Sequence, residues 1–168
     1  MTRVYIGAGS NIEPRRHLAS ALGHLSEAFG SLVISPVYRS AAAGFIGDPF
    51  LNLVIGIDSE LSITELKDVL RSIERANGYD GLGPKFSSRT LDLDLLLYGD
   101  FQGSVAGIRV PRNDVLNCSY VLWPLADIAP AERHPVTGES YETLREAFTG
   151  NRELERIPFI WRGRDLSA

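Results

Sequence analysis

The chain has 168 residues, of which 44% are hydrophobic and 23% charged, so it is long enough to bury one sizeable core. Its formal net charge of -4 excludes a broad basic field of the kind that attracts nucleic acid or an anionic membrane. A lone cysteine, Cys118, excludes an internal disulfide, and no stretch approaches the roughly 20 apolar residues that span a bilayer. We therefore expect one cytoplasmic domain over residues 1–168.

The first part of the chain predicts a strand, a helix and two further strands. Arg3 to Ala8 is a short apolar run that ends in a glycine-containing turn, which is typical of a strand. Apolar residues then recur at spacings of three and four from Leu18 to Phe29, which indicates a helix that ends at Gly30. Leu32 to Tyr38 and Phe50 to Asp58 are expected to form two strands joined by a loop.

A second helix and a further strand follow. Ser62-Ile63-Thr64-Glu65 has the capping-box pattern, and the helical spacing of apolar residues continues to Gly78. The polar, glycine-rich stretch from Tyr79 to Ser88 predicts a loop, which leads into a strand from Thr90 to Tyr98.

The C-terminal part predicts shorter elements. Ile108 to Pro111 indicates a short strand, Tyr120 to Ile128 a short helix interrupted near Pro124, and Ser140 the cap of a last helix that reaches Phe148. The overall order β-α-β-β-α-β favours an α+β fold, with a ferredoxin-like antiparallel sheet, helices on one face and a C-terminal elaboration.

Two aspartates lie on the strand after the glycine-rich loop. Side chains alternate between the two faces of a strand, so Asp92 and Asp94 share one face. The opposite face is expected to carry the leucines at positions 91, 93, 95 and 97, toward a core. The two carboxylates would lie roughly 7 Å apart, which suits hard cations such as Mg²⁺. Spacing alone favours the alternative of a solvated strand face with no metal.

The sequence around these aspartates resembles a known signature. Residues Arg89 to Gly99, which read RTLDLDLLLYG, are similar to the signature of the 6-hydroxymethyl-7,8-dihydropterin pyrophosphokinases. Supporting matches occur in the family's order at Tyr5–Asn11, Tyr38-Arg39, Phe50–Asn52, Ile73-Glu74, Val110-Pro111 and Leu122–Pro130. The resemblance covers roughly residues 4 to 130. It implies transfer of pyrophosphate from ATP to a reduced pterin in folate biosynthesis, by a monomer that needs neither nucleic acid nor membrane.

The resemblance also implies roles for individual residues. Asp92 and Asp94 would hold two Mg²⁺ ions, and Arg89 and Arg112 would join them as catalytic residues. The implied ATP-binding residues are Arg71, Glu74, Lys85, Arg89 and Arg112. The implied pterin-binding residues are Ser40, Ala41, Ala43, Phe50, Asn52 and Tyr120, with the amide of Asn52 at the pterin amide edge and the two rings flanking the pterin plane.

Some of these residues also have ordinary structural explanations. Arg71 and Glu74 lie three residues apart, which is the spacing of an exposed ion pair on a helix. Phe50 and Tyr120 could be core aromatics. An amide such as that of Asn52 inside an apolar strand needs a hydrogen-bond partner, which makes Asn52 the more informative residue.

The chain departs from the family pattern in three places. The loop at residues 79–88 lacks most of the family's arginines, with Lys85 as its one cation and Phe86 where the family has tryptophan. Arg112 and Cys118 occupy positions where the family has histidine and arginine, and residues 41–43 are alanines rather than prolines. These differences affect the ATP side most, because charged phosphate contacts are typically worth a few kcal/mol each.

Several functions therefore stay open. The chain is either an active pyrophosphokinase with a rebuilt ATP loop or a divergent pterin- or nucleotide-binding relative with weak or no transfer activity. An interaction module that keeps the fold alone would not need this polar constellation. Gly7-Ala8-Gly9 resembles part of a dinucleotide-binding motif, but Ile12 stands at the third glycine position. The three histidines lack metal-ligand spacing, and Cys118 has no identifiable catalytic base.

Overall fold

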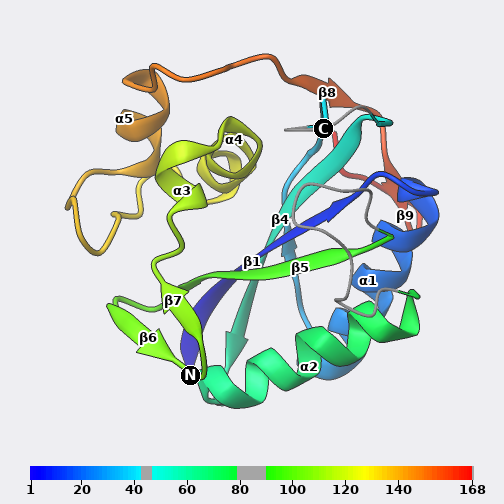
Figure 1. Ribbon diagram of the computed structural model, residues 1–168, viewed down its shortest axis with the longest axis horizontal. Helices are drawn as coiled ribbons and strands as arrows, with labels where there is room; N and C mark the ends of the chain where they lie inside the picture. The colour runs from blue at the N-terminus through cyan, green and yellow to red at the C-terminus, as the bar shows by residue number, and fades with distance from the viewer. Residues whose placement is uncertain (43–46, 79–89, 168) are drawn as a thin grey trace.

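The fold is built on a twisted antiparallel sheet (Figure 1). This computed structural model describes residues 1–42, 47–78 and 90–167. The strands of the sheet lie in the order β5-β1-β4-β3-β8, and the short strand β2 also pairs with β4. Their bounds are β1 Thr2–Ser10, β2 Val33–Ile34, β3 Val37–Ser40, β4 Phe50–Ser59, β5 Asp92–Tyr98 and β8 Glu155–Ile157.

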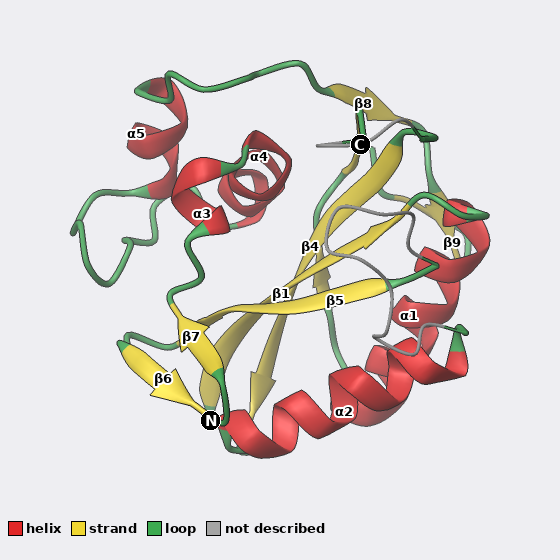
Figure 2. Ribbon diagram, viewed as in Figure 1, coloured by secondary structure: helices red, strands yellow, loops and turns green. Residues whose placement is uncertain are grey.

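Helices cover both faces of this sheet (Figure 2). The long helices α1 (Pro14–Phe29) and α2 (Ile63–Ala76) pack on one face. The short helices α3 (Asp114–Asn117), α4 (Ser119–Ile128) and α5 (Tyr141–Glu146) form a separate group, in which α4 contacts β4 and β3. The prediction of an α+β antiparallel sheet is confirmed, and the C-terminal elaboration proves to be the cover of the second face.

Alternation along β1 explains the two layers. Val4, Ile6 and Ala8 are buried in the cluster that contains the apolar stripes of α1 and α2. Tyr5 points the other way and belongs to the cluster with α4 and α5. Since the strand is buried on both faces at this point, its sequence is apolar throughout rather than alternating apolar and polar.

The helix boundaries follow the local signals in the sequence. The side chain of Ser62 accepts a hydrogen bond from the backbone N–H of Glu65, and the carboxylate of Glu65 accepts one from the N–H of Ser62. This capping box begins α2 where the sequence predicts it. Gly30 follows α1 with a φ of 79°, so its lack of a side chain permits the left-handed turn that ends the helix.

One prediction about β5 is wrong. Leu93 and Leu95 are buried against α1 and α2 as expected, but Leu97 lies in the cluster on the opposite face. Tyr5 pairs with Leu97 while the next residue, Ile6, pairs with Leu95, so Leu96 is an extra residue on β5. This β-bulge shifts the alternation, and both aspartates lie before it.

The expected single strand from Leu32 to Tyr38 is also wrong. Ser35 and Pro36 separate β2 from β3. The hydroxyl of Ser35 accepts a hydrogen bond from the N–H of Val54 at 2.8 Å, and Pro36 has no N–H to donate to a neighbouring strand. The interruption lets β3 continue as a separate strand between β4 and β8 that carries Tyr38 and Ser40.

The C-terminal region contains elements that the sequence pattern did not reveal. These are the strands β6 (Gly103–Val105) and β8, and the hairpin of β9 (Ile160–Trp161) with β10 (Arg164–Asp165). Strand β6 forms a hairpin with β7 (Ile108–Val110), which is the short strand predicted at Ile108 to Pro111. Helix α4 runs through Pro124 without the expected interruption, because burial of Leu122 and Leu125 offsets the one lost hydrogen bond. Helix α5 ends at Glu146, two residues before the expected Phe148.

A network of ion pairs joins the C-terminal elements to the sheet. The carboxylate of Asp127 on α4 accepts a hydrogen bond from the hydroxyl of Tyr38 on β3. It also pairs with Arg145 of α5 at 2.9 Å and with Arg156 of β8 at 3.2 Å.

In the described residues, no helix is long and apolar enough to cross a membrane.

Candidate active site

The two aspartates of β5 lie on the sheet face opposite α1 and α2. Leu93 between them is fully buried, whereas Asp92 and Asp94 are half-buried, as alternation predicts. Asp92 pairs in register with Gly9 of β1, and Asp94 pairs with Gly7. Neither glycine places a side chain on β1 beside these carboxylates.

The electrostatics of this pair favour a bound cation. The pKa of Asp94 is raised to about 7, mainly by burial and also by the neighbouring charge of Asp92, while Arg112 opposes the shift. A cation shared by the two carboxylates would relieve this repulsion, and carboxylate oxygens are suitable ligands for Mg²⁺. The described residues hold no group of three or more potential metal ligands, so other oxygen donors would complete the coordination.

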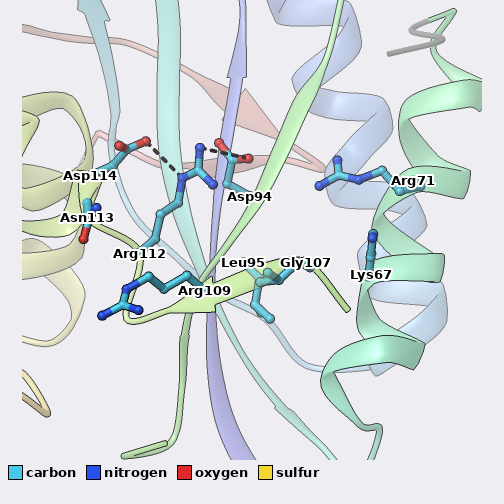
Figure 3. A pocket seen from close by; sticks show the side chains of 10 residues that line it. Lys67, Arg71, Asp94, Leu95, Gly107, Arg109, Arg112, Asn113 and Asp114 are labelled. Carbon is cyan, nitrogen blue, oxygen red and sulfur yellow. Dashed lines mark hydrogen bonds and ion pairs between the residues drawn. The ribbon is translucent and has the colours of Figure 1, made fainter. Parts of the chain in front are cut away.

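Arg112 links this pair to the segment after β7. Its backbone N–H donates to the carbonyl of Leu96 at 2.9 Å, which fixes it beside β5. Its guanidinium donates to the carboxylate of Asp114 at 3.0 Å and lies 3.7 Å from that of Asp94 (Figure 3). Arg112 is therefore held between two carboxylates, at the edge of the aspartate pair.

A cavity of about 400 Å³ opens between α2, β7 and the start of α3. Four cationic side chains line it, against the two carboxylates of Asp94 and Asp114. The cations are Lys67, Arg71, Arg109 and Arg112, which come from three parts of the chain (Figure 3). Such a surplus of positive charge suits a polyanion such as a nucleoside triphosphate.

Sequence analysis missed Lys67 and Arg109. Lys67 precedes Arg71 by four residues on α2, a spacing that places both on one helix face and was available as a signal. Its amine donates to the carbonyl of Ala106 at 2.7 Å, in the turn between β6 and β7. Arg109 had no such signal, because its position depends on how this hairpin folds against β5.

Glu74 lies behind the aspartates rather than in the cavity. Its side chain is 3% exposed, so the alternative of an exposed helical ion pair with Arg71 is wrong. One carboxylate oxygen accepts a hydrogen bond from Arg71, and the other accepts the backbone N–H of Leu93 at 2.8 Å. Arg71 also donates to the carbonyl of Leu93. Together they hold the residue between the two aspartates.

The residues expected at the pterin also share a face. Asn52 of β4 pairs in register with Tyr38 and with Gly9, and its side-chain N–H donates to the hydroxyl of Ser40 at 3.1 Å. Phe50 pairs with Ser40 and is half-buried. Because Gly9 also pairs with Asp92, Asn52 and Asp92 lie in one row on the same face, two strand spacings or about 10 Å apart.

Tyr120 approaches this face from α4. It is half-buried at the edge of the second apolar cluster, and burial raises the pKa of its hydroxyl, with smaller contributions from Cys118 and Asp94. Ala41 is exposed just after β3. Ala43, Lys85 and Arg89 lie outside the described residues, so the expectations for them stay predictions.

Comparisons with known proteins match most of the chain. Residues 5–130 match the family described as 7,8-dihydro-6-hydroxymethylpterin-pyrophosphokinase (HPPK). The chain is 37% identical over 165 residues to the 2-amino-4-hydroxy-6-hydroxymethyldihydropteridine pyrophosphokinase of Pseudomonas aeruginosa, covering 93% of this chain and 97% of that protein. It is 39% identical over 151 residues to the protein of the same name from Methylorubrum extorquens, covering 88% and 92%.

The solved structures support the fold. The crystal structure of Plasmodium falciparum HPPK-DHPS with pteroate matches with a TM-score of 0.74 at 11% sequence identity. The match covers 98% of this chain and 47% of that one, so the chain spans about half the length of this structural relative.

Proposed function

Because the chain belongs to the 7,8-dihydro-6-hydroxymethylpterin-pyrophosphokinase family, we propose that it transfers pyrophosphate from ATP to 6-hydroxymethyl-7,8-dihydropterin. The hydroxymethyl oxygen forms a bond to the β-phosphorus, the bond from that phosphorus to the oxygen shared with the α-phosphorus breaks, and AMP leaves. The alcohol loses its proton in the process. The single observation that carries the proposal is the row in which Asn52 and the aspartate pair share one sheet face.

The pterin occupies the side of this face formed by β3 and β4. The amide of Asn52, oriented by Ser40, hydrogen-bonds the amide edge of the ring, and Phe50 and Tyr120 contact its plane. The distance of about 10 Å from Asn52 to Asp92 then leaves the hydroxymethyl group of the bound pterin near the aspartates. Ala41 and Ala43 are assigned to the edge of this pterin-binding site.

The triphosphate of ATP occupies the cationic cavity. Arg71, Arg112, Lys67 and Arg109 bind and orient its oxygens, and Lys85 and Arg89 add charge from the preceding loop. Asp92 and Asp94 would hold two Mg²⁺ ions, which would supply positive charge to offset that of the phosphates. Glu74 contributes by fixing Arg71 and Leu93 rather than by touching the nucleotide.

The remaining parts of the proposal concern the protein as a whole. Residues 1–168 act as one domain, because both apolar clusters pack on the same sheet. The enzyme works as a monomer in the cytoplasm, where ATP is available, and its partners are ATP and the reduced pterin, without nucleic acid or membrane.

The test is AMP formation from ATP, Mg²⁺ and 6-hydroxymethyl-7,8-dihydropterin. We expect AMP only when the pterin is present, and loss of at least about 1,000-fold in rate for Asp92→Ala, because charge compensation at the phosphates is lost. A parent protein that binds the pterin in calorimetry but forms no AMP would instead be a divergent binding relative. Binding of neither substrate would reject both readings.

A further inference from the structure

The glycine in the middle of the row has a specific relation to Asn52. Gly9 is buried on β1 and pairs in register with Asn52 on one side and Asp92 on the other. A Cβ atom at Gly9 would lie 2.7 Å from Oδ1 of Asn52, a separation that real Cβ contacts do not show. The absence of a side chain at Gly9 is therefore what allows the amide of Asn52 its present position.

The amide has little freedom to move elsewhere. Asn52 is 9% exposed, and its Nδ2 donates to the hydroxyl of Ser40, which is itself buried. A rotation that relieved a clash with a new Cβ would pull the amide away from Ser40 and change the direction of its donor and acceptor. The substitution would change the orientation of the amide more than it would disturb the fold, because the clashing atom is at the end of a side chain. The nearest backbone atom, the carbonyl oxygen of Leu51, would lie 3.9 Å from the new Cβ.

We propose that Gly9 is a positioning and specificity-determining residue for the pterin. Because Gly9 has no side chain, the amide of Asn52 keeps the orientation in which it hydrogen-bonds the pterin, and no side chain projects from β1 between Asn52 and Asp92. The inference rests on the proposed function, since it assigns the pterin to this face. Gly9 touches neither the phosphates nor the aspartate carboxylates through a side chain. Its substitution therefore changes recognition of the pterin and spares that of ATP.

The neighbouring glycine provides a matched control. Gly7 lies two residues away on the same strand and the same face, but the three atoms nearest to a Cβ there all belong to the side chain of Leu96, the closest at 3.4 Å. A distance of 3.4 Å is at the short end of ordinary van der Waals contacts, and the side chain of Leu96 is flexible and apolar. Gly7→Ala adds the same methyl group to the same strand without touching Asn52.

The experiment measures the affinity of each variant for the pterin and for ATP, in the presence of Mg²⁺. For Gly9→Ala we expect pterin affinity to fall by about 10- to 100-fold, the equivalent of one disrupted buried hydrogen-bonding group, with ATP affinity within about threefold of the parent. Gly7→Ala should keep both within about threefold. Equal losses for the two ligands in Gly9→Ala, or equal losses in the two glycine variants, would overturn the proposal.

A double-mutant cycle with Asn52→Ala distinguishes positioning from a general effect. Once the amide is gone, adding Gly9→Ala should weaken pterin binding by less than about threefold further, since the two changes act through one group. If Gly9→Ala does not fold, the Asn52→Ala background should restore folding, because the clash is removed. Additive losses in pterin binding, or failure to fold in both backgrounds, would contradict the proposal.

These outcomes separate the inference from the function it rests on. A parent protein without pterin-dependent AMP formation would reject the proposed function itself. An active parent whose Gly9→Ala and Asn52→Ala changes are additive would reject only the role of Gly9.

Discussion

The proposed pterin side and the proposed nucleotide side of this site are built in different ways. Around Asn52 the groups are neutral, buried and hydrogen-bonded to each other on adjacent strands. Around Arg112 they are charged, partly exposed and drawn from a helix, a hairpin and a connecting segment. A neutral ring is recognised by the fixed orientation of a few polar groups, whereas a polyanion needs charge, which can be supplied from several elements.

The aspartate pair belongs to both sides, so a change there has the largest expected effect. Asp94→Asn should lower the rate of AMP formation by at least about 1,000-fold, because one of the two carboxylates proposed to hold Mg²⁺ is lost. The rate is measured at saturating ATP and pterin. Asp68→Asn, on the exposed face of α2, is the control and should keep the rate of the parent.

The same variant should stabilise the metal-free protein at high pH. Burial raises the pKa of Asp94 to about 7 in the folded state, above the ordinary value of an unfolded aspartate, so the folded state holds this proton more tightly. The parent therefore loses stability as the pH rises from about 4 to 7. Asp94→Asn should raise Tm at pH 8 in EDTA by about 3 °C, and by less at pH 4. The opposite order, a larger gain at pH 4, would contradict this account of the site.

Arg112 tests the nucleotide side alone. We expect Arg112→Ala to raise KM for ATP by about 10- to 100-fold, because a charged hydrogen bond to phosphate is lost, with KM for the pterin little changed. Arg112→Lys should recover part of the loss, since it keeps the charge without the planar fork. Steady-state kinetics with each substrate varied separately gives both constants. An equal rise in both KM values would show that the two sides are not separate.

Glu74 affects the aspartates indirectly, because it accepts a hydrogen bond from the backbone N–H of Leu93, the residue between them. Glu74→Gln keeps the shape of the side chain but removes the charge paired with Arg71. Loss of charge-assisted hydrogen bonds at a buried site should cost about 1–3 kcal/mol of stability and lower kcat by about tenfold, because Leu93 and Arg71 lose their alignment. Denaturant unfolding and kcat are the two measurements. A rise in KM for ATP with an unchanged kcat would indicate direct contact with the nucleotide instead.

The smallest effect is expected at the cavity wall. Lys67→Met removes a charge and the hydrogen bond to Ala106 that ties α2 to the turn between β6 and β7. KM for ATP should rise by about threefold, since an exposed charge contributes little. Added salt should weaken ATP binding to this variant less than to the parent, because one screened charge is gone. Lys67→Arg, which keeps the charge, should show the salt dependence of the parent.

The sequence was enough to predict the aspartate face and the fold class, and the reasons are local. Alternation places Asp92 and Asp94 on one face as long as the strand is regular, and both residues precede the bulge at Leu96. Leu97 follows the bulge, so the same rule fails for it. Bulges depend on pairing with a neighbouring strand, and no sequence pattern within β5 indicates one.

Other parts of the site depend on contacts between distant segments. The row from Asn52 to Asp92 requires the registers of β4, β1 and β5 together, which a single sequence does not specify. Likewise, Arg109 reaches the cavity because of the way β7 packs beside β5. The short strands β8, β9 and β10 have three residues or fewer and leave too little periodicity to detect.

The most direct test of the two-sided site is a crossed binding measurement. Calorimetry would give the affinity of Asn52→Ala and of Arg112→Ala for the pterin and, separately, for a non-hydrolysable ATP analogue with Mg²⁺. The account predicts that Asn52→Ala loses affinity for the pterin alone and Arg112→Ala for the nucleotide alone, by about tenfold or more in each case. If each variant weakens both ligands to the same extent, the division of the sheet face into a pterin side and a phosphate side is wrong.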